Sequence, residues 1–280
     1  MIGQEKLFEK INRWKELPRF LILNGTKYSG RKTLAKEIAR KFNSQLIFIG
    51  IKIDEIREMI KFANESDSDI IFFIDEGNRM SLGAENTLLK VTEEAPNNSH
   101  IILSVENKSL LLPTIISRGE VFNMQEYDFN DFRQYIFKNN LLSNEDELKD
   151  YNHLCFVYPN LGFLKVLPLE ESKKMYDYCE QISKDIRNAN GADAFKITEK
   201  IKLKDDQEGW DLSQFLYCLS QCCLWRLEHS ALEEQITEIR YQKNYLLILY
   251  KINKMLSNNL FNKSYILDKL IIDFKSVYFE

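Results

Sequence analysis

The chain has 280 residues, of which 44% are hydrophobic and 29% are charged, and its formal net charge is -4 at pH 7. This length allows two or three domains with a sizeable core, and the composition is ordinary for a globular protein. The slightly acidic balance excludes a bulk attraction to nucleic acid. Any DNA contact would therefore come from a local patch or from partner subunits.

The first 124 residues alternate apolar strands with amphipathic helices. Apolar runs predict strands over residues 20–24, 45–49, 70–74, 101–105 and 120–124. Helical spacing of apolar residues predicts helices from Gly30 to Phe42, over 53–63, and from an N-cap at Ser81 to a stop before Pro96. This rhythm predicts a parallel α/β sheet with right-handed crossovers.

After residue 124 the strands stop. Short helical patterns over 131–137, 146–156 and 162–167 predict a small helical domain, which ends near Pro168 and the charged run 170–174. From there the pattern is nearly all helical, with apolar stripes such as Ile266, Leu267, Leu270, Ile271 and Phe274. The expected domains are residues 1–123, 124–170 and 171–280.

The five cysteines, at positions 155, 179, 218, 222 and 223, all lie in the second half. None forms a C-x-x-C pair, so the spacing indicates neither a zinc ribbon nor a redox motif. Cys218 and Cys222 share a helical face with Leu219 nearby, which favours buried core thiols. We find no secretory pattern and no apolar stretch long enough to span a bilayer. We therefore expect a cytoplasmic protein with reduced thiols, no zinc and no membrane partner.

A loop-like motif opens the first expected helix of the sheet domain. In a phosphate-binding loop, glycines let backbone N–H groups converge on phosphate, a lysine reaches the β- and γ-phosphates, and a hydroxyl binds Mg²⁺. Aligning Gly25 and Gly30 puts Arg31 at the lysine position and Lys32 at the hydroxyl position, with Thr33 one residue late. A lysine cannot bind Mg²⁺, and an arginine fork does not replace a compact ammonium. The pattern favours a degenerate loop, because a shifted frame would need an inserted residue in a tight turn.

Asp75 and Glu76 directly follow the apolar run 70–74, as in a Walker B motif. Asp75 would lie at the carboxyl end of the strand and hold Mg²⁺, and Glu76 would orient the attacking water. Acidic residues after apolar strands are common, so the position behind a loop-like motif makes the pattern more specific. Intact acids beside a damaged loop indicate a descendant of an ATPase that kept the fold.

Arg118 stands behind this core in the run Leu112–Arg118, just after a strand-ending turn. An arginine so placed can reach out of its own fold, and its planar guanidinium can engage the terminal phosphate of a nucleotide held by a neighbouring subunit. Taken without its neighbours, Arg118 could equally cap a helix or pair with Glu120.

Three stretches resemble the AAA+ clamp loader ATPases of bacteria: residues 75–81, 84–96 and 111–118. The resemblance covers most of residues 20–125 and is most specific in Asn-x-Leu-Leu-Lys-x-x-Glu-Glu-x-Pro, residues 86–96, and in Ser117-Arg118. The chain departs from the family at Gly119, where cysteine is usual, and lacks the four-cysteine zinc module. The family's polar sensor, expected near Val105 and Glu106, has no threonine here. Gly162 falls where active relatives begin a Gly-x-x-Arg phosphate sensor, although a helix-capping glycine is an equally good interpretation.

The resemblance implies a RecA-like AAA+ domain, a small helical lid and an all-α collar that holds a five-subunit ring together. It implies that Arg118, beside Ser117, is a finger in trans. With Arg31 and Lys32 in the loop, the chain looks most like the delta-prime branch, whose members are rigid and do not hydrolyse nucleotide. The implied partners are gamma/tau-type motor subunits, delta, the sliding clamp and, through the assembly, primer–template DNA. ATP and Mg²⁺ would bind at the interface with a neighbour.

Three alternatives stay open. The first is an active gamma/tau-type motor that uses Lys32 and Thr33 in the shifted frame. The second, a stand-alone P-loop kinase, is disfavoured because such kinases need neither a helical C-terminal third nor an outward Ser-Arg pair. The third is a scaffold in which the finger is vestigial.

Overall fold

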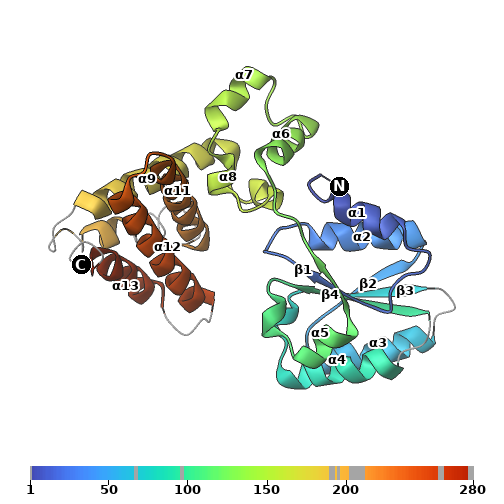
Figure 1. The fold of residues 1–280 in the computed structure, drawn as a ribbon. Coiled ribbons are helices and arrows are strands. Elements are labelled where there is room, and N and C mark those ends of the chain that lie inside the picture. The colour runs from blue at the N-terminus through green and yellow to red at the C-terminus, as the bar shows by residue number, and fades with distance from the viewer. Residues whose placement is uncertain are drawn as a thin grey trace. The chain divides into compact units, whose positions relative to one another are not determined.

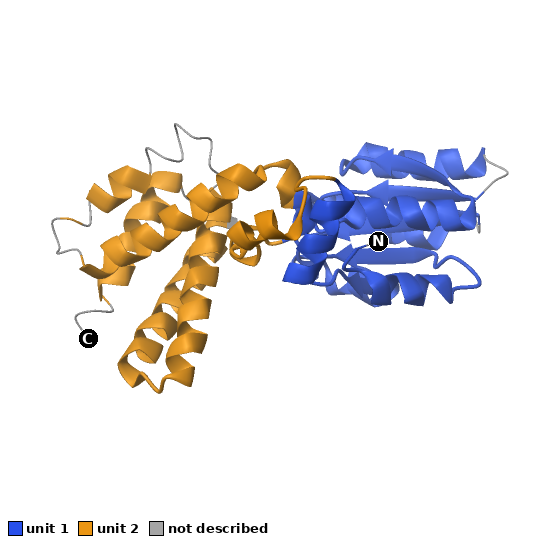
Figure 2. Ribbon diagram, turned by 90° about the horizontal axis from the view of Figure 1, so that it is seen from above, with its two compact units in different colours: residues 1–139, 160–162 blue, residues 140–159, 163–280 orange. Residues whose placement is uncertain are grey.

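The computed structural model describes residues 2–65, 69–94, 98–188, 193, 196–201, 212–257 and 262–276. The chain forms two compact units, residues 1–139 with 160–162 and residues 140–159 with 163–280 (Figure 2). The expected boundary after residue 123 lies inside the first unit, between β5 and α6, and the one after residue 170 falls in the first turn of α9. The division into three domains stays a prediction.

The first unit is built on a five-stranded parallel sheet (Figure 1). Its order is β2-β3-β4-β1-β5, with every neighbouring pair parallel. The strands are β1 (Phe20–Asn24), β2 (Gln45–Ile49), β3 (Ile70–Ile74), β4 (Ser99–Val105) and β5 (Glu120–Asn123). The strands predicted from the sequence are confirmed, with β4 starting two residues earlier and β5 ending one residue earlier.

Helices cover both faces of this sheet, and each face has its own core. Figure 1 shows α1 (Glu5–Asn12) and α2 (Arg31–Phe42) on one face and α3 (Ile53–Asn64), α4 (Leu82–Glu94) and α5 (Pro113–Arg118) on the other. Along β1, Leu21 and Leu23 join one core cluster, whereas Phe20 and Ile22 join the other. A strand buried on both sides needs apolar residues at every position, which explains the uninterrupted apolar runs.

Helices α1 and α5 go beyond what the sequence pattern predicted. Helix α5 has six residues, with Pro113 in its first turn, so it is too short to show a helical period. Arg118 is therefore the last residue of a short helix rather than part of a strand-ending turn. Helix α4 ends at Glu94, and the predicted stop at Pro96 lies outside the described residues.

The remaining elements are helical, as expected. Helix α6 (Phe129–Lys138) is followed by α7 (Glu145–Leu148) and α8 (Leu154–Val157), so the helix expected over 146–156 is broken in two. Residues Leu161–Lys165 form the 3₁₀ helix η4. The long helices are α9 (Leu169–Asn188), α11 (Leu212–Leu232), α12 (Ile236–Ser257) and α13 (Lys263–Ser276). The predicted stripe on α13 is confirmed, because all five of its residues are buried.

Four of the five cysteines, at positions 179, 218, 222 and 223, are buried, and Cys155 is half-buried. This confirms the prediction of core thiols. Burial raises the pKa of Cys223 to about 12, which keeps this thiol protonated at neutral pH. Across the described part of the chain, none of the helices combines the length and apolarity that a bilayer crossing needs.

Candidate functional site

The segment between β1 and α2 is a strand-to-helix turn that contains two residues of positive φ. The Gly25 N–H donates to the Val105 carbonyl at 3.0 Å, which ties the end of β1 to the end of β4. Gly30 precedes α2 with a φ of 95°, in the left-handed region that glycine tolerates best. Tyr28 has a φ of 64°, so the loop turns sharply at a residue other than glycine as well. The helix begins at Arg31, at the position that the glycine alignment gives to the lysine.

The Arg31 side chain is turned into the protein. It is only 8% exposed, and its Nη1 donates to the Val105 carbonyl at 3.0 Å and to the Thr26 carbonyl at 3.3 Å. Burial lowers the pKa of Arg31, and the nearby Asp75 carboxylate opposes this shift. The cation therefore braces the inside of the loop against β4.

Lys32 and Thr33 lie on the exposed side of α2. The Lys32 Nζ is 4.5 Å from the centre of the Phe48 ring, which belongs to β2. This is a cation–π contact in which the ammonium faces the neighbouring strand. The lysine that a shifted frame would need is thus turned towards β2 instead of the loop.

Three carbonyl oxygens of the loop accept hydrogen bonds from side chains. Arg31 donates to residue 26, as described above. Asn160 Nδ2 donates to the carbonyl of residue 27 at 2.6 Å, and the Tyr127 hydroxyl donates to that of residue 29 at 2.8 Å. Sequence reasoning missed Asn160 and Tyr127, because they lie about a hundred or more residues from the loop. Together these donors fix the loop in one conformation.

Gly162 touches the same loop by close backbone approach. A Cβ atom at this position would lie 2.3 Å from the Tyr28 carbonyl oxygen, where no side chain can fit without movement. Gly162 lies inside η4 and not at a helix cap, so the capping interpretation is wrong. The glycine is required because residues 160–162 pack directly on the loop.

The Walker B-like acids are held by neighbours within the same unit. Asp75 Oδ1 accepts from the Ser104 hydroxyl at 2.8 Å and from the Glu76 N–H at 3.0 Å. Glu76 has a φ of 55° and its carboxylate pairs with Arg79 at 2.7 Å. Ser104 is fully buried on β4, one residue before the position where the sequence comparison sought a polar sensor. Ser104 is a polar residue within the apolar run 101–105, and this exception is the signal by which the sequence could have marked it as a site residue.

Arg118 lies at the opposite edge of the sheet from these groups. The loop and Asp75 follow the carboxyl ends of β1 and β3, whereas Arg118 precedes the amino end of β5, which runs parallel to β1. Strands of four or five residues at about 3.3 Å per residue separate the two edges by roughly 13–17 Å. The Arg118 side chain is 41% exposed. Arg118 is therefore accessible, and it is distant from the β1–α2 loop and from Asp75 of its own unit.

The ion-pair partner of Arg118 is Glu93, on the last turn of α4. Glu120 instead pairs with Lys10 at 2.8 Å, so the alternative pairing of Arg118 with Glu120 is wrong. The Ser117 hydroxyl donates to the Thr114 carbonyl at 3.0 Å, inside α5.

Gly119 follows the arginine where relatives carry cysteine. A Cβ at Gly119 would lie 2.7 Å from the Ile22 side chain, so glycine suits the crowded β5 entry in this chain. The departure from the family pattern is thus explained by crowding against Ile22 of β1, and the Arg118 side chain stays exposed.

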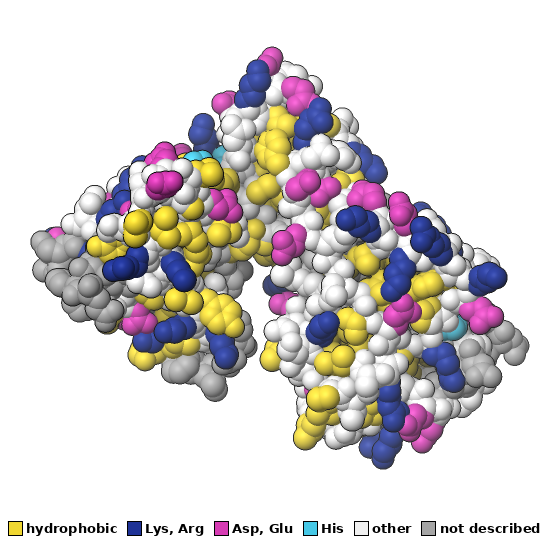
Figure 3. Space-filling model, viewed as in Figure 1, with side chains coloured by type: hydrophobic (Ala, Val, Ile, Leu, Met, Phe, Trp, Pro, Cys, Tyr) yellow, Lys and Arg dark blue, Asp and Glu magenta, His cyan; other side chains and the backbone are white. Residues whose placement is uncertain are grey.

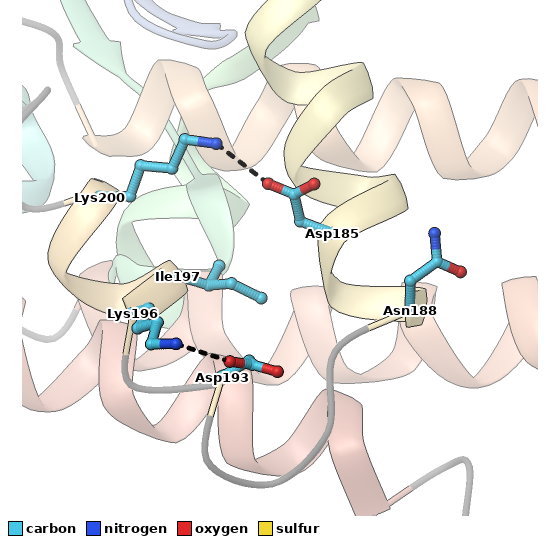
Figure 4. Close-up of a pocket in the computed structure, with 6 residues that line it drawn as sticks. All are labelled: Asp185, Asn188, Asp193, Lys196, Ile197 and Lys200. Carbon is cyan, nitrogen blue, oxygen red and sulfur yellow. Dashed lines mark hydrogen bonds and ion pairs between the residues drawn. The ribbon is translucent and has the colours of Figure 1, made fainter.

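The second unit contains a pocket whose charged side chains pair with one another. It has a volume of about 340 Å³ and is lined by Asp185, Asn188, Asp193, Lys196, Ile197 and Lys200. Figure 4 shows that each lysine points to an aspartate, and both contacts are 3.0 Å long. The charges of these lining residues are balanced in pairs, so neither lysine is left over for an anionic ligand. On the face shown in Figure 3, basic and acidic side chains are interspersed.

Comparison with known proteins finds sequence similarity to subunits of DNA polymerase III. Residues 49–128 match the family described as "DNA polymerase III, delta subunit". DNA polymerase III subunit tau of Bacillus subtilis is 36% identical over 74 residues, which are 26% of this chain and 13% of that protein. DNA polymerase III subunit delta' of Haemophilus influenzae is 30% identical over 77 residues, which are 27% and 24% of the two chains. Over these stretches the chain is similar to subunits of bacterial DNA polymerase III.

The chain spans about half or less of the length of the curated relatives that it matches. DNA polymerase III subunit gamma of Buchnera aphidicola is 26% identical over 187 residues, which are 53% of this chain and 52% of that protein. Two solved structures show the fold alone. A gamma subunit-related protein of Thermotoga maritima has a TM-score of 0.51 at 18% identity, covering 98% and 99% of the two chains. A point mutant of RuvB from that organism has a TM-score of 0.50 at 15% identity, covering 77% and 87%. The predicted RecA-like AAA+ fold with a helical C-terminal region is confirmed.

Proposed function

We propose that this chain is a non-hydrolysing, delta-prime-type subunit of a DNA polymerase III clamp loader. In this proposal it supplies Arg118 in trans to the ATP site of a neighbouring motor subunit. The observation that carries the proposal is the separation of Arg118 from its own loop by the length of the sheet. An accessible arginine that is distant from its own loop is suited to a nucleotide held by another chain.

The chain's own loop fits Mg²⁺–ATP poorly, which supports the non-hydrolysing assignment. Arg31 donates to two carbonyl oxygens, and Lys32 faces Phe48. Neither contact leaves a compact ammonium at the position where the β- and γ-phosphates would bind. Asp75 keeps a second oxygen that could bind Mg²⁺, because Ser104 and the Glu76 N–H use only Oδ1, so the poor fit lies in the loop and not in this carboxylate.

The proposed partners follow from this role. Gamma/tau-type motor subunits would hold ATP and Mg²⁺ at the interface, delta would complete the ring, and the ring would load the sliding clamp on primed DNA in the cytoplasm. The net charge of -4 supports DNA contact mainly through the assembly.

Arg118→Ala tests the proposal in a loader reconstituted from this chain and the motor subunits of its own organism. We expect ATPase turnover stimulated by clamp and DNA to fall by about 10³- to 10⁵-fold, as when a finger is removed from related sites. Ring assembly, measured by gel filtration, should be unchanged. Arg57→Ala is the matched control, because Arg57 is also exposed and paired with a carboxylate, Asp54, on the same unit. Full turnover in the Arg118→Ala loader would exclude the finger role.

A second candidate, an active motor subunit, is favoured by the matches to tau and gamma proteins. Calorimetry of the isolated chain with ATP and Mg²⁺ separates the two candidates. We expect no binding, because Lys32 is turned away from the loop. Tight Mg²⁺-dependent binding that Lys32→Ala abolishes would instead establish the motor.

A further inference from the structure

Helix α5 is bonded to α4 at both of its ends. At the start, the buried Glu85 carboxylate of α4 accepts from the Leu112 N–H at 2.8 Å. At the other end, the Glu93 carboxylate pairs with Arg118. Between these bonds the Ile115 side chain is fully buried in the core beneath α5. Helix α5 is thus bonded to α4 at both ends and anchored in the core at its centre.

The spacing of the two glutamates along α4 is similar to the distance between their partners at the two ends of α5. From Glu85 to Glu93 a helix rises about 12 Å, and from Leu112 to Arg118 the rise is about 9 Å. The two helices therefore run in the same direction, side by side, as they appear in Figure 1. With α5 bonded at both ends, the side-chain torsions of Arg118 decide where its guanidinium points.

Glu93 acts on those torsions through one arm of the guanidinium. The contact is made by Nη1, and the guanidinium carries five N–H donors in one plane. Fixing one arm to a carboxylate sets the direction of the plane and leaves other donors available to a phosphate. The Glu93 side chain is 58% exposed, so the pair restrains Arg118 without removing it from a neighbouring chain.

We propose that Glu93 is a positioning residue for Arg118, holding the guanidinium in the orientation in which it meets the phosphate of the adjacent subunit. This inference rests on the finger role proposed above. In this role Glu93 would affect the rate of ATP hydrolysis in the adjacent subunit without touching the ATP site.

The test is the ATPase of the reconstituted loader carrying Glu93→Ala. We expect kcat to fall by about two- to fivefold, the factor that an exposed ion pair supports, with KM for ATP and ring assembly unchanged. Glu93→Gln should retain most of the rate, because its amide oxygen still accepts from Arg118. Glu94→Ala is the matched control, since Glu94 is the neighbouring exposed glutamate of the same turn and should have no effect.

The possible outcomes are distinct. If Glu93→Ala turns over like Glu94→Ala while Arg118→Ala is inactive, the finger stands and the positioning role fails. If Glu93→Ala raises turnover, Glu93 competes with the phosphate, and the inference is overturned. A change in KM or in assembly would mean a merely structural role. Full activity of Arg118→Ala would remove the proposed function itself.

Discussion

Replacing Gly162 by alanine probes how closely residues 160–162 are packed on the loop. The new Cβ would lie 2.3 Å from the Tyr28 carbonyl oxygen and 2.7 Å from the Tyr28 Cβ, whereas ordinary contacts begin at 3.4 Å. The two segments must therefore separate by about 1 Å. The hydrogen bond from Asn160 to the Lys27 carbonyl, now 2.6 Å long, would then exceed hydrogen-bonding distance.

Two effects set the size of the loss. Overpacking of a tight contact costs about 1–3 kcal/mol, and the lost hydrogen bond costs about 1 kcal/mol. We expect Gly162→Ala to lower the free energy of unfolding by about 2–4 kcal/mol. Asn160→Ala alone should cost about 1 kcal/mol, and the double variant should lose less than the sum, because both substitutions break the same contact.

Urea denaturation measures these changes as shifts in the midpoint at constant slope. Gly83→Ala is the control. Its Cβ would first meet the flexible tip of the Ile53 side chain at 3.0 Å, and it lies on the exposed side of α4, so it should be neutral or stabilise by up to about 1 kcal/mol. A Gly162→Ala protein within about 0.5 kcal/mol of the wild type would refute the close-contact argument.

Four further results are expected. Buried thiols should stay unreactive towards a thiol reagent at neutral pH, with only the half-buried Cys155 labelled before unfolding; rapid native labelling of a second cysteine would contradict this. Because burial raises the pKa of Cys223 from 9.0 to about 12, its contribution to stability is complete below pH 9 and is lost as the pH rises towards 12, which pH-dependent thermal unfolding would detect. Burial lowers the pKa of His153 below 6.5, so its contribution to stability is present above pH 6.5 and is lost as the pH falls. His153→Gln can keep the bond to Ser172 and should weaken the loss of thermal stability below pH 6.5. An unchanged loss would exclude His153 as its source. Glu85→Ala should cost about 1–3 kcal/mol by leaving the Leu112 N–H, at the N-cap of α5, unpaired. Glu85→Gln should cost less, and equal losses would show that packing dominates.

The sheet could be predicted from the sequence because helices cover both of its faces, which makes its inner strands largely apolar. Strands β1, β2 and β3 coincide with apolar runs that end at polar or glycine residues, and such runs carry their own boundaries. The amphipathic stripes of α3 and α13 were visible for the same reason, since a helix that packs on one side repeats its apolar residues. The positions of Arg31, Lys32, Asp75 and Arg118 in the chain were also plain from spacing and resemblance.

Only the tertiary structure decided what those residues touch. The donors that hold the loop, Tyr127 and Asn160, lie far from it in sequence, and hydrogen bonds of this kind leave no periodic pattern. Helix α5 was hidden because six residues complete fewer than two turns. The pairing of Arg118 with Glu93 instead of Glu120 depends on α4 lying beside α5, a choice of partners that packing makes after each helix has formed. Local pattern fixes an element and its buried face, whereas the direction of an exposed charge is set by whichever neighbour the fold brings within reach.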